Sequence, residues 1–538
     1  MPRPLNIEDH LRILADEAPN QIALISPQGT MSYAELEQAS SDCASGLERS
    51  GISRGTRTVL MVTPGPEMLI LAFGLIKLRA IPILIDPGMG LRNLKKCLEE
   101  CGPEAFIGIP KAHLARILLG WGRGSVRRKV MVGGFPFPGT ISWSTVMEKG
   151  RRFPVDREQG SPDDLAAIVF TSGSTGIPKG VVYTHRMFSA QARLLKESFN
   201  IAEGEVDLAT FPLFALYDPA LRMTTVFPRM DFTQPGKVDP MEIIGPIQEH
   251  RVTHMFGSPA LLNRVGRFGK ERGIKMPTIK RVLSAGAPVS DQVLDAFAEM
   301  LSPEALIHTP YGATEALPVS SISHLEREEI GGVAEGKGVC VGRALPGVDL
   351  RIVGLSDEPI PTWNDELGTE TGAVGEITVR GDNVSPEYFK RDEATRLAKI
   401  PVPGGGFYHR MGDLGYRDDQ GRIWFCGRKS HRVQIPGGTL FTVPCEGIFN
   451  AHPAVYRTAL VGVVRAGKEL PVLCVELESG FEGDRENVRA ELLETGSRYE
   501  MTSQIKTILF HSGFPVDIRH NAKIFREKLA VWAQEELK

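Results

Sequence analysis

The stretch IVFTSGSTGIPKGVVYTH, residues 168–185, carries the strongest structural and chemical pattern of the chain. It begins with an apolar run that ends at Phe170, as a buried strand would. The loop that follows is rich in hydroxyl side chains and glycine and contains one lysine: Thr171, Ser172, Gly173, Ser174, Thr175, Gly176, Lys179 and Gly180. Glycines let neighbouring backbone amides point together at an anion, and the hydroxyls and the lysine add donors. The pattern predicts a phosphate-binding loop, although composition alone fits a flexible surface loop about equally well.

On both sides of this loop, up to about residue 310, short apolar runs alternate with helical spacing. The helical spacing covers residues 33–50 and 67–78. The apolar runs are IALIS (22–26), TVLMV (58–62), IPILI (81–85), AFIGI (105–109), LAAIVF (165–170), VTHMF (252–256) and RVLSA (281–285). Nearly continuous apolar runs are typical of strands that are buried on both faces. The alternation therefore predicts layered α/β structure with parallel sheets.

The later part of the chain has a different character. Short strand-like pieces such as DLRIV and GEITVRG stand among glycine and proline and predict a small β subdomain. FCGRKSHRVQIPGG (425–438) follows, and its basic and glycine residues indicate an exposed connector. Alternating helix and strand patterns then fill the chain to its end, which predicts a compact α+β domain of roughly a hundred residues. The expected fold is α/β: a large N-terminal domain of layered sheets, this β subdomain and a smaller C-terminal domain.

The composition excludes several classes of function. Lys+Arg 62 against Asp+Glu 65 gives a net charge of −3, so no global basic field would hold a nucleic acid or an anionic membrane. The N-terminal residues include acids and lack a long apolar core, which argues against a signal peptide. The apolar stretch Met68–Ile76 is too short to span a bilayer and predicts a buried helix. The seven scattered cysteines fit a reduced compartment, so we expect a cytoplasmic protein.

Further motifs follow the loop in order along the chain. They are SAGAP (284–288), YGATE (311–315), MGDLGY (411–416), GRKS (427–430) and HNAKIFREK (520–528). Together with TSGSTGIPKG they resemble the adenylate-forming superfamily, which includes acyl-CoA synthetases, peptide-synthetase adenylation domains and beetle luciferase. The resemblance covers essentially the whole chain and implies that ATP and Mg²⁺ are bound.

The resemblance also implies a role for each motif. Residues 171–176 would hold the phosphates of ATP. Gly286, Ala287 and Pro288 would line the adenine pocket. In the YGATE motif, Tyr311 would stack on adenine beside Gly312, Thr314 would contact the α-phosphate and Glu315 would hold Mg²⁺. Asp413 would accept hydrogen bonds from the ribose, which Arg428 would also reach. Lys179, Glu315 and Lys523 would be the catalytic residues.

The same resemblance implies two domains with the active site between them. Residues 1–427 would form the AMP-binding domain, residues 428–433 the hinge with Ser430 at its centre, and residues 434–538 a mobile catalytic domain. In the implied reaction a substrate carboxylate attacks the α-phosphorus of ATP, and pyrophosphate leaves. Lys179 and Mg²⁺ would offset the charge on the leaving group, and Lys523 would offset charge where the new bond forms.

Several residues differ from a typical acyl-CoA ligase. FPLFALYDPAL (211–221) has Ala215 and Asp218 where such ligases often carry His and Gly. Gln434, Thr439, Pro444 and Ala522 also depart from the common pattern around the connector and the C-terminal lysine. In ligases these regions form the path of the thiol acceptor. The departures therefore put the use of CoA in doubt.

FPLFALYDPAL, GVVYTH and PVDIRHNAKIFREKLAVWA are similar to the olefin β-lactone synthetases of bacterial hydrocarbon biosynthesis. That resemblance implies a 2-alkyl-3-hydroxy fatty acid as substrate, whose own 3-hydroxyl attacks the adenylated carboxyl group to give a β-lactone and AMP. It also implies association with other hydrocarbon-biosynthesis enzymes. A fatty acyl-CoA or acyl-AMP ligase is the alternative, while a luciferase-like oxygenase or a non-catalytic ATP-binding module fits the residues less well.

The acyl group needs an apolar pocket, and the motif neighbourhood suggests its residues. The candidates are Phe214, Ala215, Leu216, Tyr217, Asp218 and Phe256, with Leu221, Met255 and Leu317 as further members. Any of them could instead belong to the hydrophobic core. His185 follows the loop directly, but histidine recurs at this place in the superfamily and a structural role is expected.

Overall fold

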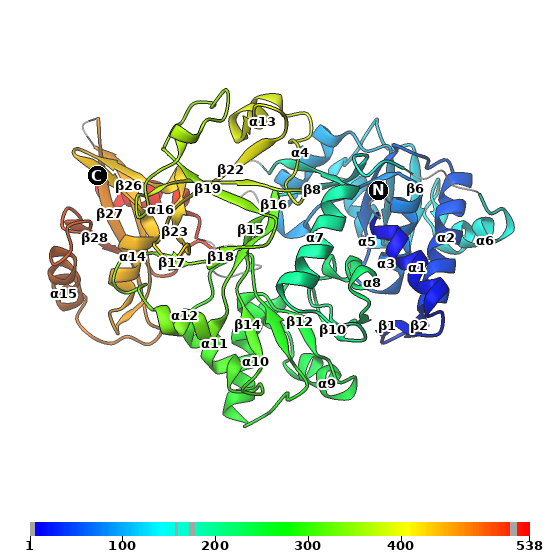
Figure 1. Ribbon diagram of the computed structural model, residues 1–538, viewed down its shortest axis with the longest axis horizontal. Helices are drawn as coiled ribbons and strands as arrows, with labels where there is room; N and C mark the ends of the chain where they lie inside the picture. Colours follow the sequence, from blue (N-terminus) through cyan, green and yellow to red (C-terminus); the bar gives the residue numbers. More distant parts are fainter. Residues whose placement is uncertain (1–5, 156–159, 172–177, 466, 517–523) are drawn as a thin grey trace. The chain divides into compact units, whose positions relative to one another are not determined.

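The apolar runs of the N-terminal part form two seven-stranded sheets in the computed structural model, which describes residues 6–155, 160–171, 178–465, 467–516 and 524–538 (Figure 1). Sheet A has the order β14 (Leu306–His308), β13 (Arg281–Leu283), β12 (His254–Phe256), β10 (Val206–Leu208), β11 (Thr224–Val226), β1 (Ile22–Ser26), β2 (Gly29–Ser32). Sheet B has the order β7 (Ile141–Ser142), β6 (Arg128–Met131), β5 (Ala105–Gly108), β3 (Arg57–Met61), β4 (Ile81–Leu84), β8 (Leu165–Phe170), β9 (Gly180–Thr184).

Parallel pairing dominates both sheets and confirms the predicted fold class. In sheet B, Val59 of β3 is the register partner of Ile83 on one side and of Phe106 on the other. The exception is β9, which pairs with β8 in antiparallel orientation and places Gly180 opposite Phe170. Strand β1 does not match the expectation of burial on both faces, because antiparallel β2 closes that edge of sheet A and leaves Ile22 exposed.

Helices cover the sheets and contribute many residues to the core. They are α1 (Ile7–Glu17), α2 (Tyr33–Arg49), α3 (Pro66–Lys77), α4 (Leu91–Cys101), α5 (Pro110–Leu119), α6 (Trp143–Arg152), α7 (His185–Ser198), α8 (Asp218–Leu221), α9 (Met241–Glu249), α10 (Pro259–Glu271) and α11 (Asp291–Ala298). The short 3₁₀ turns are η1 (Pro87–Met89), η2 (Phe214–Leu216) and η3 (Pro235–Lys237).

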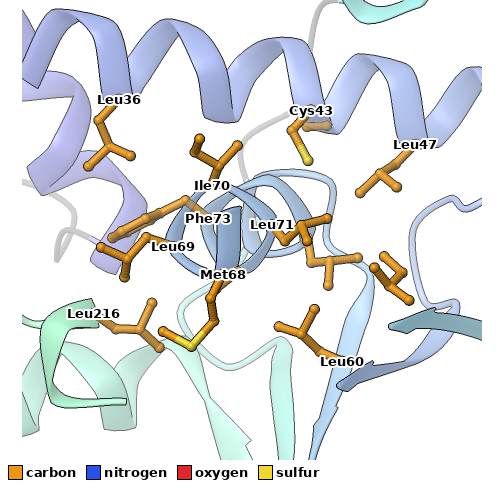
Figure 2. Close-up of a cluster of buried hydrophobic side chains, with 14 of the residues drawn as sticks. Leu36, Cys43, Leu47, Leu60, Met68, Leu69, Ile70, Leu71, Phe73 and Leu216 are labelled. Atoms are coloured by element: carbon orange, nitrogen blue, oxygen red, sulfur yellow. The ribbon is translucent and has the colours of Figure 1, made fainter. Parts of the chain in front are cut away.

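Helix α3 is buried on all sides, as its apolar sequence predicts. Figure 2 shows it along its axis, with α2 crossing on one side and Leu60 of β3 and Leu216 of η2 on the other. Gly74 permits the close approach of α2, because a Cβ atom there would lie 2.6 Å from the Cys43 sulfur. Among the described helices, none is long and apolar enough to cross a membrane.

The chain divides into two compact units. The first unit contains residues 1–308, 312–318 and 382–395, and the second contains residues 309–311, 319–381 and 396–538. The first unit therefore holds sheets A and B, and the segment 382–395 returns to it from a distant part of the sequence. The predicted domain boundary at residues 428–433 lies inside the second unit and stays a prediction.

The second unit is built from smaller, mostly antiparallel sheets. Its largest sheet has the order β17 (Val339–Cys340), β23 (Ile423–Arg428), β22 (Phe407–Arg417), β20 (Gly375–Arg380), β19 (Asp349–Val353), and β21 (Lys399–Pro401) pairs with β22. Two other sheets join β24 (Val433–Ile435) to β25 (Gly438–Leu440), and β26 (Val455–Arg465) to β27 (Lys468–Leu477) and β28 (Thr507–Phe510). The other strands of this part of the chain are β15 (Tyr311–Ala313), β16 (Ala316–Ser321) and β18 (Arg343–Ala344).

The helices of this part of the chain complete the predicted α+β pattern. They are α12 (His324–Ile330), α13 (Asp392–Ala398), α14 (Thr442–Asn450), α15 (Arg485–Ser497) and α16 (Arg526–Glu536), with the 3₁₀ turns η4 (Asp365–Leu367) and η5 (Lys429–His431). The prediction of an exposed connector over residues 425–438 is wrong in part. Residues 425–428 complete strand β23, and Cys426 and Val433 are buried because the apolar side chains of this stretch pack into the second unit.

Candidate active site

Two hydrogen bonds join Thr171 and Lys179, the residues that directly follow strand β8 and directly precede strand β9. The Thr171 N–H donates to the Lys179 carbonyl oxygen at 3.1 Å, and the Lys179 N–H donates to the Thr171 hydroxyl at 3.1 Å. Strands β8 and β9, which are antiparallel, flank this pair. The predicted phosphate ligands Ser172, Gly173, Ser174, Thr175 and Gly176 lie outside the described residues.

The Lys179 side chain lies over the ring of Tyr388, with Nζ 4.5 Å from the ring centroid. Burial lowers the pKa of the Lys179 ammonium; the negative charge of Glu315 opposes this shift, and the positive charge of Arg391 adds to it. Within the part of the chain that the structure describes, Lys179 forms no ion pair. A partly desolvated cation without a paired carboxylate is suited to meet an anionic ligand.

Glu315 is bound by the hydroxyl of the same tyrosine. The Tyr388 hydroxyl donates to Glu315 Oε1 at 2.7 Å, and the Ser385 N–H donates to the Glu315 carbonyl oxygen at 2.8 Å. Tyr388 therefore contacts both residues, the lysine through its ring and the carboxylate through its hydroxyl. Lys179, Tyr388 and Glu315 are called the lysine cluster below.

Tyr388 owes its position to the segment that returns to the first unit. The Val182 N–H donates to the Glu387 carbonyl oxygen at 3.1 Å, and the Phe389 N–H donates to the Gly180 carbonyl oxygen at 2.7 Å. These bonds lay the segment along strand β9. Sequence reasoning missed Tyr388, because no spacing or composition in SPEYFKRDEAT marks a partner two hundred residues away.

The backbone of Thr314 is hydrogen-bonded to a buried tyrosine. The Tyr183 hydroxyl donates to the Thr314 carbonyl oxygen at 2.7 Å. Burial raises the pKa of Tyr183, and the side chain of Gln191 beside it opposes that shift. Gln191 in turn accepts a 2.5 Å hydrogen bond from the Tyr217 hydroxyl. Two buried polar pairs, Tyr217 with Gln191 and Tyr183 with Thr314, thus lie next to each other.

The pocket candidates divide into two groups. Phe214 and Phe256 are half-buried and pack together with ring centroids 4.9 Å apart. Ala215 and Leu216, by contrast, belong to the core around α3. Of the further members, Leu221 and Met255 are buried and Leu317 is half-buried. The structure therefore brings together the aromatic part of the predicted pocket.

Asp218 is fully enclosed. Its Oδ2 accepts a 2.5 Å hydrogen bond from the Thr225 hydroxyl, and Thr225 is the cross-strand partner of Asp207. Burial raises the pKa of Asp218 to about 7, although the Thr225 hydrogen bond lowers it. Burial and the charge of Asp218 also raise the pKa of Asp207. Two buried carboxyl groups therefore adjoin one threonine.

The loop predicted to line the adenine pocket follows β13. Gly286 is exposed and has φ +92°, a left-handed conformation that favours glycine. Ala287 is half-buried and Pro288 is exposed. In the YGATE motif, a Cβ atom on Gly312 would lie 2.8 Å from the Ala316 carbonyl oxygen, so only glycine fits there.

In the second unit, Asp413 gathers the other predicted nucleotide ligands. The Tyr311 hydroxyl donates to Asp413 Oδ2 at 2.7 Å, and Arg428 Nη1 lies 3.0 Å from Asp413 Oδ1. Asp413 and Arg428 are register partners on β22 and β23, which explains why the two motifs meet. The carboxylate is almost fully buried, with 3% of its residue surface exposed. Tyr311, Asp413 and Arg428 are called the aspartate cluster below.

Comparison with known proteins shows the family of this chain. Residues 11–389 match the family described as AMP-binding enzyme. The chain belongs to this family. It is 46% identical to the olefin beta-lactone synthetase of Xanthomonas campestris, over 99% of this chain and 98% of that protein. The olefin beta-lactone synthetase of Stenotrophomonas maltophilia is 45% identical over 100% of this chain and 99% of that protein.

Solved structures share the fold of this AMP-binding enzyme. The amide bond synthetase McbA from Marinactinospora thermotolerans superposes with a TM-score of 0.79 at 20% identity, covering 98% of this chain and 99% of that chain. ATP-bound MatB from Rhodopseudomonas palustris superposes with a TM-score of 0.79 at 21% identity, covering 99% of this chain and 100% of that chain. The predictions of an adenylate-forming fold and of an AMP-forming ligase are confirmed.

The C-terminal candidates of this AMP-binding enzyme are only partly described. Lys523 lies outside the described residues, and its role stays a prediction. Nearby Arg526 is anchored, because its Nη2 lies 2.6 Å from Glu446 Oε2 on α14. The hinge candidate Ser430 is exposed on η5, between Lys429, whose Nζ lies 3.2 Å from Glu376 Oε2, and Arg432, whose Nη2 lies 2.5 Å from Asp357 Oδ2.

His185 has the surroundings of a structural residue. Its Nε2 lies 2.5 Å from Arg79 Nη1, and Arg79 Nη2 lies 2.7 Å from Glu8 Oε1. Burial raises the pKa of Glu8, but the hydrogen bond and charge of His185 and the charge of Arg79 lower it further than burial raises it. These contacts tie α7 to α1 and are in keeping with the predicted structural role.

The surroundings of Glu315 suit magnesium. Mg²⁺ in phosphate-handling enzymes is held by one or two carboxylates together with phosphate oxygens. Within the described residues, no group of three or more metal-ligating side chains gathers. A single carboxylate such as Glu315, with the phosphates of a nucleotide completing the coordination, matches this requirement.

Proposed function

We propose that this AMP-forming ligase uses ATP and Mg²⁺ to adenylate a long-chain 2-alkyl-3-hydroxy fatty acid and then closes it to a β-lactone. The observation that carries the proposal is the full-length identity of 46% and 45% to two proteins named olefin beta-lactone synthetase. The half-buried Phe214 and Phe256 supply an apolar, aromatic wall for an alkyl chain.

Adenylation begins with attack of a carboxylate oxygen on the α-phosphorus, with pyrophosphate as the leaving group. The desolvated Lys179 ammonium attracts the phosphate oxygens more strongly than an exposed lysine would. The Tyr388 hydroxyl orients the Glu315 carboxylate by a hydrogen bond. Mg²⁺, bound through Glu315, would offset charge on the leaving pyrophosphate. In the second unit, the Asp413 carboxylate accepts hydrogen bonds from the ribose hydroxyls.

Lactone formation then uses the substrate's own hydroxyl group. Its oxygen attacks the acyl carbon, the bond from that carbon to the phosphate oxygen breaks, AMP leaves, and the hydroxyl proton is released. An intramolecular nucleophile is held close to its target, which offsets part of the strain of a four-membered ring. No thiol acceptor is needed, consistent with the altered residues of the connector.

The deciding experiment compares two acids with and without CoA. The 3-hydroxy acid should give β-lactone, AMP and pyrophosphate over many turnovers, indifferent to CoA. The matched acid without the 3-hydroxyl should form about one equivalent of adenylate and then stall, because a buried adenylate is protected from water. Rapid-quench measurement of AMP and pyrophosphate separates these cases. CoA-dependent turnover of the deoxy acid would overturn lactone formation and leave the adenylation step standing.

Lys523→Ala is the control for the adenylation step. If Lys523 offsets charge at the forming bond, its removal should abolish ATP–pyrophosphate exchange while the thermal unfolding curve stays unchanged. Near-normal exchange in a folded variant would remove Lys523 from the mechanism.

A further inference from the structure

Helix α5 presents an apolar face outward. Leu114, Ile117 and Leu118 are 50%, 56% and 74% exposed. Spacings of three and four residues place them on one side of the helix, and exposed Lys111 lies on the same side. The residues of the opposite face that pack on the core are Ala112, Ala115 and Leu119. The outward side chains therefore contribute little to the packing of the first unit.

A second apolar group stands beside this helix. Phe135 is 93% exposed and lies in the loop GGFPFPG, residues 133–139. That loop contacts the start of α5, since a Cβ atom on Gly134 would lie 3.0 Å from Pro110 Cγ and the rings of His113 and Phe137 are 6.5 Å apart. Phe135 thus extends the apolar face of the helix.

The sequence that contains these side chains carries charge of one sign only. Residues 105–147 contain six basic residues and no aspartate or glutamate: Lys111, Arg116, Arg123, Arg127, Arg128 and Lys129. Within the described part of the chain, none of these six forms an ion pair. The preceding acid, Glu104, is already paired with Arg57 at 3.2 Å. The net charge of −3 therefore conceals a local basic region.

We propose that this α5 surface, comprising Leu114, Ile117, Leu118, Phe135 and the basic residues around them, docks on a bilayer that contains anionic lipids. Amphipathic helices of this kind lie in the interface with the apolar side chains at the boundary of headgroups and acyl chains. Unpaired lysine and arginine side chains are attracted to anionic headgroups. An anionic lipid surface would therefore attract the basic side chains and also provide an apolar phase for Phe135.

An acidic protein partner is the competing occupant, and the shape of the surface argues against it. Protein interfaces centre on aromatic or arginine residues that fill pockets, with a polar rim. Here a proline- and glycine-flanked phenylalanine and three aliphatic side chains stand outward, with no polar acceptors among them. A fluid apolar phase accommodates such side chains without a complementary pocket.

Docking would serve the delivery of substrate. This part of the inference rests on the proposed function, since a long-chain acid partitions into lipid rather than water. The docking itself does not depend on it. If the chain failed to adenylate any acid, the vesicle experiment below would still decide whether the α5 surface binds lipid.

Flotation of the full-length protein with vesicles tests the proposal. Two vesicle types are needed: phosphatidylcholine alone, and phosphatidylcholine mixed with phosphatidylglycerol. The test variants are Ile117→Glu with Leu118→Glu, and Arg123→Glu with Arg127→Glu. The matched control is Val531→Glu on α16, which is 61% exposed and lies in the other unit. Phe135→Trp supplies a fluorescence probe of insertion.

The expected result is binding to the mixed vesicles that weakens at least about tenfold in each double variant and stays unchanged in Val531→Glu. The tryptophan emission should shift to shorter wavelength only with the mixed vesicles. All variants should keep normal ATP–pyrophosphate exchange with a short, water-soluble acid, which shows that they are folded. The proposal would be overturned if the protein did not float with the mixed vesicles, or if all variants floated equally. It would also be overturned if the wild type formed an oligomer that the α5 variants lost, because the surface would then bind protein.

Discussion

The lysine cluster of the first unit and the aspartate cluster of the second are organised in opposite ways. In the aspartate cluster a buried carboxylate already has a tyrosine hydroxyl at 2.7 Å and an arginine at 3.0 Å. In the lysine cluster the cation and the carboxylate form no ion pair among the described residues, and each of them contacts Tyr388 instead. The first arrangement is satisfied without a ligand and stabilises the fold. The second leaves a partly desolvated cation without an ion pair, which costs stability and favours an anion.

The largest effect on adenylation is expected for substitution of Lys179. Lys179→Ala should slow adenylation about 10²–10³-fold, because a preorganised charge near the phosphates is lost. The melting temperature should stay equal or rise, since the change removes a desolvated cation that has no paired carboxylate. ATP–pyrophosphate exchange and thermal unfolding measure the two effects.

Lys390→Ala is the matched control for this prediction. Lys390 lies on the same returning segment and over an aromatic ring, with Nζ 5.2 Å from the Phe389 centroid, but is exposed. It should leave exchange unchanged. A clear loss of stability in Lys179→Ala would contradict the distinction between the clusters.

In contrast to Lys179, a substitution of Asp413 should lower the stability of the fold as well as nucleotide binding. Asp413→Asn leaves Arg428 without its counter-charge and weakens the acceptor for the ribose, so both stability and nucleotide affinity should fall. Hydrogen bonds to charged groups contribute about 1.5–3 kcal/mol, which corresponds to roughly one to two decades in affinity. Calorimetric titration with ATP and thermal unfolding check this.

Asp418→Asn provides the control on the same hairpin. Asp418 Oδ2 accepts hydrogen bonds from Arg422 Nε at 2.6 Å and from Trp424 Nε1 at 2.9 Å. This variant should lose stability and keep its ATP affinity. Unchanged ATP affinity in Asp413→Asn would remove that residue from the nucleotide site.

A smaller effect is expected at the tyrosine of the lysine cluster. Tyr388→Phe keeps the ring under Lys179 and deletes the hydroxyl that orients Glu315. The magnesium concentration for half-maximal activity should rise, and the rate at saturating magnesium should fall by about tenfold or less. Tyr33→Phe, which also removes a buried hydroxyl bonded to a carbonyl group, should not change the magnesium dependence. Identical magnesium curves for wild type and Tyr388→Phe would show that the hydroxyl does not position the carboxylate.

The smallest effect concerns Asp218 and the pH dependence of stability. Its pKa is raised from 3.8 to about 7 in the folded chain, chiefly by burial, so the protonated form favours folding. That contribution is present below about pH 4 and is lost as the pH rises through 7. Asp218→Asn cannot ionise and can still accept from Thr225, so its melting temperature should fall by a few degrees less between pH 5 and pH 8. Parallel curves for the two proteins would argue that Asp207 or Tyr33 dominates this region.

Much of this arrangement follows from local sequence, and the remainder does not. The apolar runs predicted seven strands of sheets A and B to within a few residues, because burial leaves a continuous apolar signal. These strands are β1, β3, β4, β5, β8, β12 and β13, and the other strands of the two sheets were not predicted. The motifs containing Asp413 and Arg428 were both predicted to reach the ribose, and their cross-strand pairing fits that. Tyr388 carries no local signal, since its role arises from contacts with Glu315 and with strand β9, which are far from it in the sequence. Ala215 and Leu216 were predicted in a pocket and lie in the core, because an apolar residue has the same sequence pattern in either place.

The segment 382–395 that returns to the first unit affects how the protein folds during its synthesis on the ribosome. Strand β9 emerges early, but the Ser385 hydroxyl that bonds to the Val182 carbonyl oxygen follows 203 residues later. At about 5–20 residues per second, β9 waits on the order of 10–40 s for that partner. During this interval the edge of sheet B has free amide and carbonyl groups, the kind of surface on which nascent chains aggregate. Slowing translation between residues 185 and 382 should therefore lower the soluble yield, and nascent chains released before residue 382 should be caught by chaperones more often than those released after residue 395.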